Sequence, residues 1–352
     1  MTADRQRTPG IADCQDARSQ RKMHGFDPSP LRLEKKVCRA QWLLPLALML
    51  VLLATPRVAA QQRLEKVRLT VPAKSLTFIP FYYGKAQGMY AREGIDLEII
   101  VMRPPLGVTA LVAGDLDYSA AGGLSIRAAM KGAGIRTIGF IQTRLSFSLI
   151  GQPGMVPAKI KNVAVSGIGS LAHYAATLVM KRLNNEKIAY ISTNTTASSY
   201  TALVSKVVDA AILSPPYTSM ATLASYPELG NTYDVRDLQG GLVARQDYIQ
   251  QRPERVKSMI RATLRSMDAI TKNEREVVVY LQKEFGQEPK IAADTYRIVR
   301  QVVNADGDIE DAVLRSIVDK IRQEAGVASE VPLDRLVDLA ILREVKAELI
   351  RR

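Results

Sequence analysis

Two short segments rich in glycine and serine stand where helices are expected to begin. They are Gly122-Gly123 and Gly167-Ile168-Gly169-Ser170. Glycine lets a ligand approach the backbone closely. The free amides and the dipole at a helix N-terminus favour a negative group such as a carboxylate or a sulfonate. Tight turns and helix caps use the same residues, so the pattern predicts either an anion-binding site or a purely structural turn.

Hydroxyl, aromatic and guanidinium groups on further loops offer contacts that would orient a small molecule. We expect Thr77, Phe78 and Tyr217 to be the main side-chain contacts, because aromatic walls with a few polar groups are typical of small-molecule clefts. Arg103 and Arg144 are candidates for a clamp on an anion, although a surface ion pair is the commoner fate of an arginine. The polar segment 193–196 could supply hydroxyls or cap the helix that follows it. The full predicted ligand-binding set is Ser75, Thr77, Phe78, Arg103, Gly122, Gly123, Gly167, Gly169, Ser170, Thr195, Ser214 and Tyr217.

Groups suited to catalysis are sparse. Once the leader described below is removed, the chain keeps one histidine, His173, and loses both cysteines, Cys14 and Cys38. It holds no Gly-x-Ser-x-Gly elbow, no His-x-x-His pattern and no phosphate-binding loop. We therefore expect no catalytic residue, metal site, cofactor, disulfide or enzyme activity. For His173 a position on a helix face is the commoner role, and a ligand contact is the alternative.

The bulk composition favours a folded chain with a small-molecule or membrane partner. The 352 residues exceed what one compact core usually holds, which favours two lobes. The net charge is +13, but the basic residues are spread along predicted helices without an arginine-rich run, so no nucleic-acid partner is expected. Moderate positive charge instead favours an anionic solute or an anionic membrane surface.

Residues 1–60 are interpreted as an N-terminal extension and a signal peptide. Basic residues over 32–39 precede an apolar run over 42–54, and Val58-Ala59-Ala60 predicts cleavage after Ala60. The apolar run is shorter than the roughly 20 residues that a membrane-spanning helix needs, and a retained anchor is the alternative. Translation from Met23 would give a leader of more usual length.

The rest of the chain alternates short strands with helices in two series. Strands are expected at 67–71, 95–101, 116–120 and 135–141, then at 163–166, 188–192 and 210–213, with a long helix over 79–93. This alternation predicts an α/β fold with mostly parallel sheets covered by helices. Beyond Gly240-Gly241 only amphipathic helices are expected, at 253–271, 274–285, 289–303, 309–324 and 333–349.

A weak internal sequence similarity links the two series of strands and helices. Residues 110–120 (ALVAGDLDYSA) and 202–212 (ALVSKVVDAAI) both contain a helix end, a turn, an aspartate and a strand of small residues. Chance similarity between two ordinary turns is an equally open interpretation. Ligands of open α/β sheets bind beyond the carboxyl ends of the strands. We expect five loops to converge there, at 74–78, 103–107, 121–125, 167–170 and 214–217.

The run over 77–98 (TFIPFYYGKAQGMYAREGIDLE) resembles the opening of the sulfonate, nitrate and thiamine-pyrimidine class of ABC-importer binding proteins. Landmarks at 114–117, 163–170 and 208–211 follow in the order of that family, and the resemblance extends over 67–217. One departure is Lys206, where the family usually has glycine. Because lysine tolerates a positive φ less well, we expect this turn to be built differently.

This resemblance implies a bilobal type II periplasmic-binding-protein fold with a helical C-terminal layer. Two crossings, near 145–151 and 235–243, would join lobe I (64–147 plus 241–352) to lobe II (148–240). The implied function is that of a periplasmic, monomeric receptor that closes its lobes around a small anionic or heteroaromatic solute. Its partners would be the membrane permease and the ATPase of an ABC importer.

Two other functions stay open. The chain could be a periplasmic ligand-sensing module for a membrane receptor, although it contains no kinase or cyclase segment. Fungal relatives make the thiamine pyrimidine and carry a cysteine-rich motif, and its absence here argues against that enzyme activity. The identity of the solute does not follow from the sequence.

Overall fold

The computed structural model of the chain describes residues 64–351. The expected N-terminal extension, the signal peptide with its cleavage after Ala60, and both cysteines lie outside the described residues. Within the described residues, no helix combines the length and the apolar character needed to cross a membrane.

The first sheet is mixed and has the strand order β2-β1-β3-β10-β4. Strands β2, β1 and β3 are parallel, and β10 lies antiparallel between β3 and β4. Buried side chains of this sheet and of the helices packed on it form one large apolar core. The strands are β1 (Glu65–Val71), β2 (Ile95–Val101), β3 (Tyr118–Ser119), β4 (Ile135–Arg144) and β10 (Arg236–Arg245).

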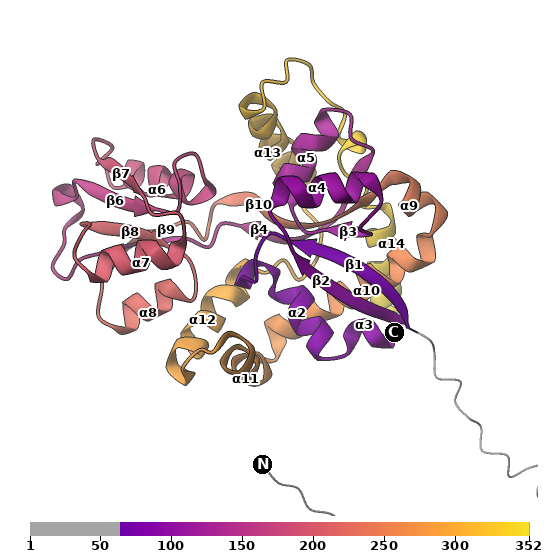
Figure 1. Ribbon diagram of the computed structural model, residues 1–352, viewed down its shortest axis with the longest axis horizontal. Coiled ribbons are helices and arrows are strands. Elements are labelled where there is room, and N and C mark those ends of the chain that lie inside the picture. Colours follow the sequence, from indigo (N-terminus) through magenta and orange to yellow (C-terminus); the bar gives the residue numbers. More distant parts are fainter. Residues whose placement is uncertain (1–63, 352) are drawn as a thin grey trace, which may run out of the picture. The chain divides into compact units, whose positions relative to one another are not determined.

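Helices from both ends of the described chain cover the first sheet (Figure 1). The N-terminal set is η1 (Leu76–Phe78), α2 (Ile79–Ala86), α3 (Met89–Arg92), α4 (Pro104–Ala113) and α5 (Gly122–Met130). The C-terminal set is α9 (Gln246–Gln251), α10 (Pro253–Lys272), α11 (Glu274–Phe285), α12 (Pro289–Val302), α13 (Asp311–Glu324), η3 (Leu333–Arg335) and α14 (Ala340–Ile350).

The second sheet has the order β7-β6-β8-β5-β9, and its strands β7, β6 and β8 are parallel. Helices α6 and α7 flank it and close two smaller apolar clusters (Figure 1). The strands are β5 (Ser148–Gly151), β6 (Asn162–Val165), β7 (Ala189–Ser192), β8 (Ala210–Leu213) and β9 (Glu228–Asn231). The helices are η2 (Pro157–Lys159), α6 (Leu171–Arg182), α7 (Thr196–Val204) and α8 (Tyr217–Leu223).

Two chain passages join the sheets, over 145–147 from β4 to β5 and over 232–235 from β9 to β10. Two αβ sheets with two passages and a C-terminal run of helices confirm the predicted bilobal α/β fold. The expected lobe boundary between 240 and 241 falls inside β10, which pairs with β3 and β4. We therefore propose 64–147 plus 236–351 as the first lobe and 148–235 as the second.

Several local elements differ from the sequence-based predictions, and strands β5 and β9 and helices α8 and α9 were not predicted. The single helix expected over 79–93 is two helices, because Gly88 between them has a left-handed φ of 67°. The helix expected over 333–349 is the short η3 followed by α14. Strand β10 was not expected, because Gly240-Gly241 in its middle is typical of a chain break.

The two glycines of β10 allow close packing, Gly240 against the neighbouring strand β4 and Gly241 against both β4 and the start of α5. A Cβ added at Gly240 would lie 2.7 Å from Cγ1 of Ile141, and one added at Gly241 would lie 3.2 Å from the carbonyl oxygen of Gly139. A Cβ at Gly122 would lie 3.2 Å from the Gly241 amide nitrogen. This close approach fixes where α5 begins, and it is the structural reason for glycine at 122.

The turn at Lys206 has the conformation that glycine would adopt. Its φ is 58°, in the same left-handed region as the φ of 91° at Gly114, the equivalent residue of the first lobe. The expectation that this turn is built differently is therefore wrong. The hydrogen bonds around it, considered in the Discussion, hold the lysine in a conformation that L-residues rarely adopt.

Candidate binding site

A cavity of about 620 Å³ opens between the two lobes. The first lobe contributes the start of α5 and one side of α13, and the second lobe contributes the start of α6. Strand β10, which leads back into the first sheet, provides the floor between them. The residues lining the cavity are Pro72, Pro104, Ala121, Gly122, Gly123, Leu124, Arg127, Gly169, Ser170, Leu171, Tyr174, Asp237, Leu238, Gln239, Ile317, Lys320, Ile321 and Glu324.

Helix α5 presents an uncapped N-terminus to this cavity. Its N-cap residue is Ala121, and no side chain caps it. The amides of Gly123 and Leu124 belong to the first turn, whose N–H groups have no acceptor within the helix itself. A Cβ at Gly123 would meet the Leu238 carbonyl oxygen at an ordinary 3.6 Å, so this glycine is not required by packing. Gly123 is thus the better placed of the two glycines to meet a ligand.

Helix α6 has a more complete cap. The Ser170 hydroxyl accepts a hydrogen bond of 3.2 Å from the His173 amide, and the Gly169 amide donates one of 3.0 Å to Nδ1 of His173. The Gly169 amide was predicted as a possible hydrogen-bond donor to an anion, but it already donates to His173. The imidazole also packs edge-on against Tyr190, with ring centroids 4.5 Å apart. His173 holds the 167–170 loop in place.

Four charged side chains line the cavity, and they form two ion pairs. Lys320 lies 3.0 Å from Asp237, and Arg127 lies 3.2 Å from Glu324. The ammonium of Lys320 also sits 3.4 Å from the ring centroid of Tyr174, on the other lobe. Burial pulls the pKa of Lys320 down, but Asp237 and Tyr174 outweigh it, so the pKa lies above its usual value. Lys320 is therefore charged at neutral pH.

A buried amide network holds the two crossing strands together beside the cavity. The Gln142 side-chain amide donates to Gln239, to the Ser146 hydroxyl at 3.3 Å and to the Arg144 carbonyl at 2.9 Å. The Ser146 hydroxyl donates to the Gln239 side chain at 3.2 Å. Because Gln239 also lines the cavity, the network connects the passage between the lobes with the cavity floor.

The structure brings four of the predicted contact residues into this cavity: Gly122, Gly123, Gly169 and Ser170. Phe78 is only 5% exposed and belongs to the core of the first lobe. Thr195 caps α7, because its hydroxyl accepts a hydrogen bond of 3.0 Å from the Ser198 amide. The cap formed by Thr195 is the alternative that the sequence left open, whereas the core position of Phe78 shows that its prediction as a ligand contact was wrong.

The other predicted contacts lie outside the cavity lining, with Thr77 in η1, Tyr217 at the start of α8 and the rest on loops; they are Ser75, Thr77, Arg103, Gly167, Ser214 and Tyr217. Arg103 is exposed, immediately precedes the lining residue Pro104, and has no ion-pair partner within 64–351. Tyr217 packs beside Tyr200, with ring centroids 5.7 Å apart. Arg144 donates to the Tyr233 carbonyl at 3.3 Å within the passages between the lobes. As ligand contacts, all of these residues stay predictions.

Sequence reasoning missed the charged side chains of the cavity and its aromatic wall. Asp237, Lys320 and Tyr174 come from a strand and two helices far apart in the chain. Only the spacing of Lys320 and Glu324, one helical turn apart, was visible in the sequence. No motif signals that these groups meet.

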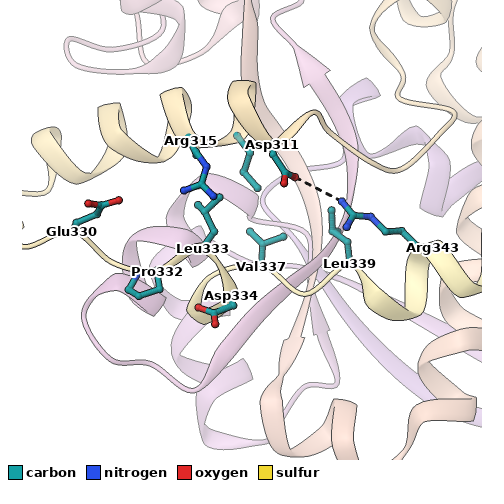
Figure 2. Close-up of a pocket in the computed structure, with 10 residues that line it drawn as sticks. Asp311, Arg315, Glu330, Pro332, Leu333, Asp334, Val337, Leu339 and Arg343 are labelled. Carbon is teal, nitrogen blue, oxygen red and sulfur yellow. Dashed lines mark ion pairs between the residues drawn. The ribbon is translucent and has the colours of Figure 1, made fainter.

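A second hollow, of about 690 Å³, lies over the C-terminal segment (Figure 2). Residues between 311 and 343 form its entire lining, which includes the ion pair of 3.8 Å between Asp311 and Arg343. It contains no residue from the loops at the strand ends. We place the candidate site in the cavity between the lobes, because that is where residues of both lobes converge. Among the described residues, no group of three or more histidine or carboxylate side chains is suited to hold a metal ion.

The chain belongs to the NMT1/THI5-like family, whose match spans residues 75–277. No curated protein matches the chain by sequence. Its fold is shared with solved periplasmic binding proteins of ABC importers, which confirms the resemblance found in the sequence.

Three solved structures illustrate the shared fold. One is the putative sulfonate ABC transporter protein SsuA, a periplasmic sulfonate-binding protein of Methylobacillus flagellatus, with 16% identity over 82% of this chain and 96% of that one and a TM-score of 0.64. The periplasmic aliphatic sulphonate binding protein SsuA of Escherichia coli has 17% identity, coverage of 78% and 92%, and a TM-score of 0.60. A mutant of DszB in complex with biphenyl-2-sulfinic acid has 11% identity, coverage of 80% and 99%, and a TM-score of 0.60.

Proposed function

We propose that the protein is the periplasmic substrate-binding component of an ABC-type importer and binds a small anionic or heteroaromatic solute between its lobes. The observation that carries this proposal is the cavity of about 620 Å³ lined by the starts of two helices, one from each lobe. The uncapped first turn of α5 supplies amides suited to a negative group, and Tyr174 supplies an aromatic wall.

Closure of the lobes would follow from differential contact. A solute that touches α5 on one lobe and α6 on the other gains more interactions when the lobes approach, so it shifts the population toward the closed form. The passages at 145–147 and 232–235, held by the Gln142 network, are the expected hinge. The permease and the ATPase would then receive the solute from the closed form.

Export fits the same proposal. The basic segment, the apolar run and Val58-Ala59-Ala60 are the parts of a signal peptide, and the SsuA relatives are described as periplasmic. We propose cleavage after Ala60, a monomeric mature protein, and binding of the solute without chemical change.

A thermal-shift screen of the protein against small sulfonates, carboxylates, nitrate and pyrimidines tests the proposal. A ligand at 100 times its Kd stabilises the fold by about 2.7 kcal/mol, which a melting curve resolves. The variant Gly123→Asp places a carboxylate at the start of α5, where it suits the helix dipole but repels an anion. We expect this variant to fold and to lose the ligand-induced shift.

The matched control is Gly134→Asp, which introduces the same charge where a Cβ would have no neighbour within 4 Å. It should keep the full shift. A screen in which no solute stabilises the protein, or a Gly123→Asp variant that responds like the parent, would contradict the proposed site. Small-angle scattering should show a smaller radius of gyration with the ligand than without it.

A further inference from the structure

The inner cation of the cavity, Lys320, is not free to bind a simple anion. Each cation already has a carboxylate partner, Lys320 with Asp237 and Arg127 with Glu324. Asp237 is buried, with 9% of its surface exposed, and it also accepts a hydrogen bond of 2.7 Å from the Leu238 amide. A bare anion that drew Lys320 away would leave a buried carboxylate without a counter-ion, which is strongly unfavourable.

The surroundings of the Lys320 ammonium form a site for a cation. The carboxylate of Asp237, from the hinge strand β10, lies on one side of it at 3.0 Å. The ring face of Tyr174, from α6 of the second lobe, lies on the other at 3.4 Å from the centroid. A carboxylate and an aromatic face are the groups that recognise ammonium ions in proteins. Lys320 itself, from α13 of the first lobe, occupies that site.

We propose that the solute is a compact zwitterion whose ammonium group replaces that of Lys320 between Asp237 and Tyr174. The inference rests on the proposed function and names the class of its solute. The released Lys320, together with the amides of Gly123 and Leu124, then binds the anionic end of the same molecule. The exchange leaves the buried Asp237 carboxylate with a cationic partner and gives the released Lys320 an anionic one, whereas a simple anion supplies no cation for Asp237 and a simple amine supplies no anion for Lys320.

The second ion pair has no part in this exchange. The side chains of Arg127 and Glu324 are 37% and 50% exposed, so water already screens them. A matched control for the inner pair lies outside the cavity lining, where Asp234 of the second lobe pairs with Arg182 at 2.9 Å.

The first experiment tests the ammonium site without knowledge of the solute. The variant Lys320→Ala removes the resident ammonium, and ethylammonium chloride should then raise its melting temperature more than the same concentration of sodium chloride does. The parent chain should show no such difference. The double variant Lys320→Ala with Asp237→Asn should lose the response. Absence of the response, or an equal response in the double variant, overturns the proposal.

The second experiment compares matched solutes by titration calorimetry on the intact protein. The pairs are 2-aminoethanesulfonate with ethanesulfonate, 3-aminopropanesulfonate with propanesulfonate, and 4-aminobutanoate with butanoate. At least one zwitterion should bind at least tenfold more tightly than its partner without the amine. Asp237→Asn should reduce that ratio to below threefold, and Asp234→Asn, outside the cavity lining, should leave it unchanged.

The outcomes separate this inference from the proposed function. If the compound lacking the amine binds as tightly as its zwitterion, or if no zwitterion binds, the zwitterion proposal is overturned. The proposed function survives either result as long as another solute of the thermal-shift panel binds and Gly123→Asp abolishes that binding.

Discussion

Residues 110–120 of the first lobe and 202–212 of the second contain the same turn from helix to strand. In the first lobe the Gly114 amide donates to the Leu111 carbonyl and the next amide to the Ala110 carbonyl. In the second lobe the Lys206 amide donates to the Leu203 carbonyl and the next amide to the Ala202 carbonyl. The pairs match residue for residue, so the weak sequence similarity reflects a shared hydrogen-bonding pattern.

An aspartate three residues after each turn ties it to the neighbouring strand, and here the lobes differ. The Asp117 carboxylate accepts a hydrogen bond from one backbone amide, that of Arg68 at 2.8 Å. Asp209 accepts hydrogen bonds from two, Lys161 at 2.8 Å and Asn162 at 3.2 Å. The amide of each aspartate also donates to the neighbouring strand, from Asp117 to the Arg68 carbonyl at 3.1 Å and from Asp209 to the Asn162 side chain at 2.8 Å. The lobe with the strained lysine thus has the stronger tether. The comparison shows that the backbone hydrogen bonds determine the conformation of the turn. Glycine at its left-handed position only lowers the free-energy cost of adopting it.

Removal of the aspartate side chain that ties each turn to its neighbouring strand should lower the free energy of unfolding more than the other changes. The loss should be larger in the second lobe. Asp209→Ala leaves two amides without their charged acceptor and should cost about 2–3 kcal/mol of unfolding free energy. Asp117→Ala, which frees one amide, should cost roughly half as much. Urea unfolding of both variants measures the difference. Asp209→Asn keeps one acceptor oxygen and should lie between the parent and Asp209→Ala. Equal losses in the two lobes would refute the comparison.

Substitution of the turn glycine should have the next largest effect. Gly114→Ala forces an L-residue into a φ of 91° and should cost about 1–2 kcal/mol. Crowding adds little, because the new Cβ would lie at an ordinary 3.5 Å from Nη1 of Arg245. The matched control is Lys206→Ala, which keeps an L-residue in the left-handed region and should change the unfolding free energy very little. Thermal unfolding with both variants tests this contrast.

The reverse change in the second lobe should stabilise the protein. Lys206→Gly relieves the left-handed strain of about 1–2 kcal/mol and adds about 0.5–1 kcal/mol of chain entropy to the unfolded state. The net gain should be roughly 0.5–1 kcal/mol, read as a higher urea midpoint. A loss of stability would mean that the lysine side chain contributes more than its backbone costs.

Lowering the pH should reduce the stability of both lobes slightly, and by different amounts. In the first lobe, burial raises the pKa of Asp308, but hydrogen bonds from Arg343 and the Ile309 amide outweigh it, and the net pKa is lowered. In the second lobe, the hydrogen bond from Arg182 lowers the pKa of Asp234, an aspartate that is largely exposed. A lowered carboxyl pKa stabilises the fold above the ordinary value, and this stability is lost as the pH falls through the lowered one.

The acid-dependent loss should be below about 1 kcal/mol for each pair because both arginines are exposed. Below pH 5 the free energy of unfolding should fall less steeply in Arg343→Gln and in Arg182→Gln than in the parent. The change should be larger for Arg343→Gln, because its partner Asp308 is more buried than Asp234, the partner of Arg182. Unfolding curves at several acidic pH values compare the two variants, and an equal or opposite ranking would contradict the assignment.

Periodicity and caps predicted most of the helices and the parallel strands. The predicted 274–285 is reproduced as α11, and the predicted 253–271 and 289–303 differ from α10 and α12 by one residue at one end. Such helices have continuous apolar faces and clear end signals, which are local properties of the chain. Strand β10 was missed because its two glycines allow close packing against β4 and α5, which no local pattern reveals.

The candidate site was predicted in part. The two glycine-serine segments were found because a helix start with small residues is visible in a short stretch of sequence. Phe78 was offered as a contact because it is aromatic and next to a loop, but its side chain packs in the core. Burial of a single aromatic depends on what the rest of the chain places over it.

The sequence alone determined the α/β class, the two-part organisation and the helix starts that face each other, because these follow from spacing, caps and turn residues along short stretches. Tertiary structure alone decided which charges meet in the cavity. Asp237, Lys320 and Tyr174 lie on a strand and two helices whose mutual placement depends on the packing of whole lobes. Electrostatic partners separated by so many residues are fixed only when the chain has folded.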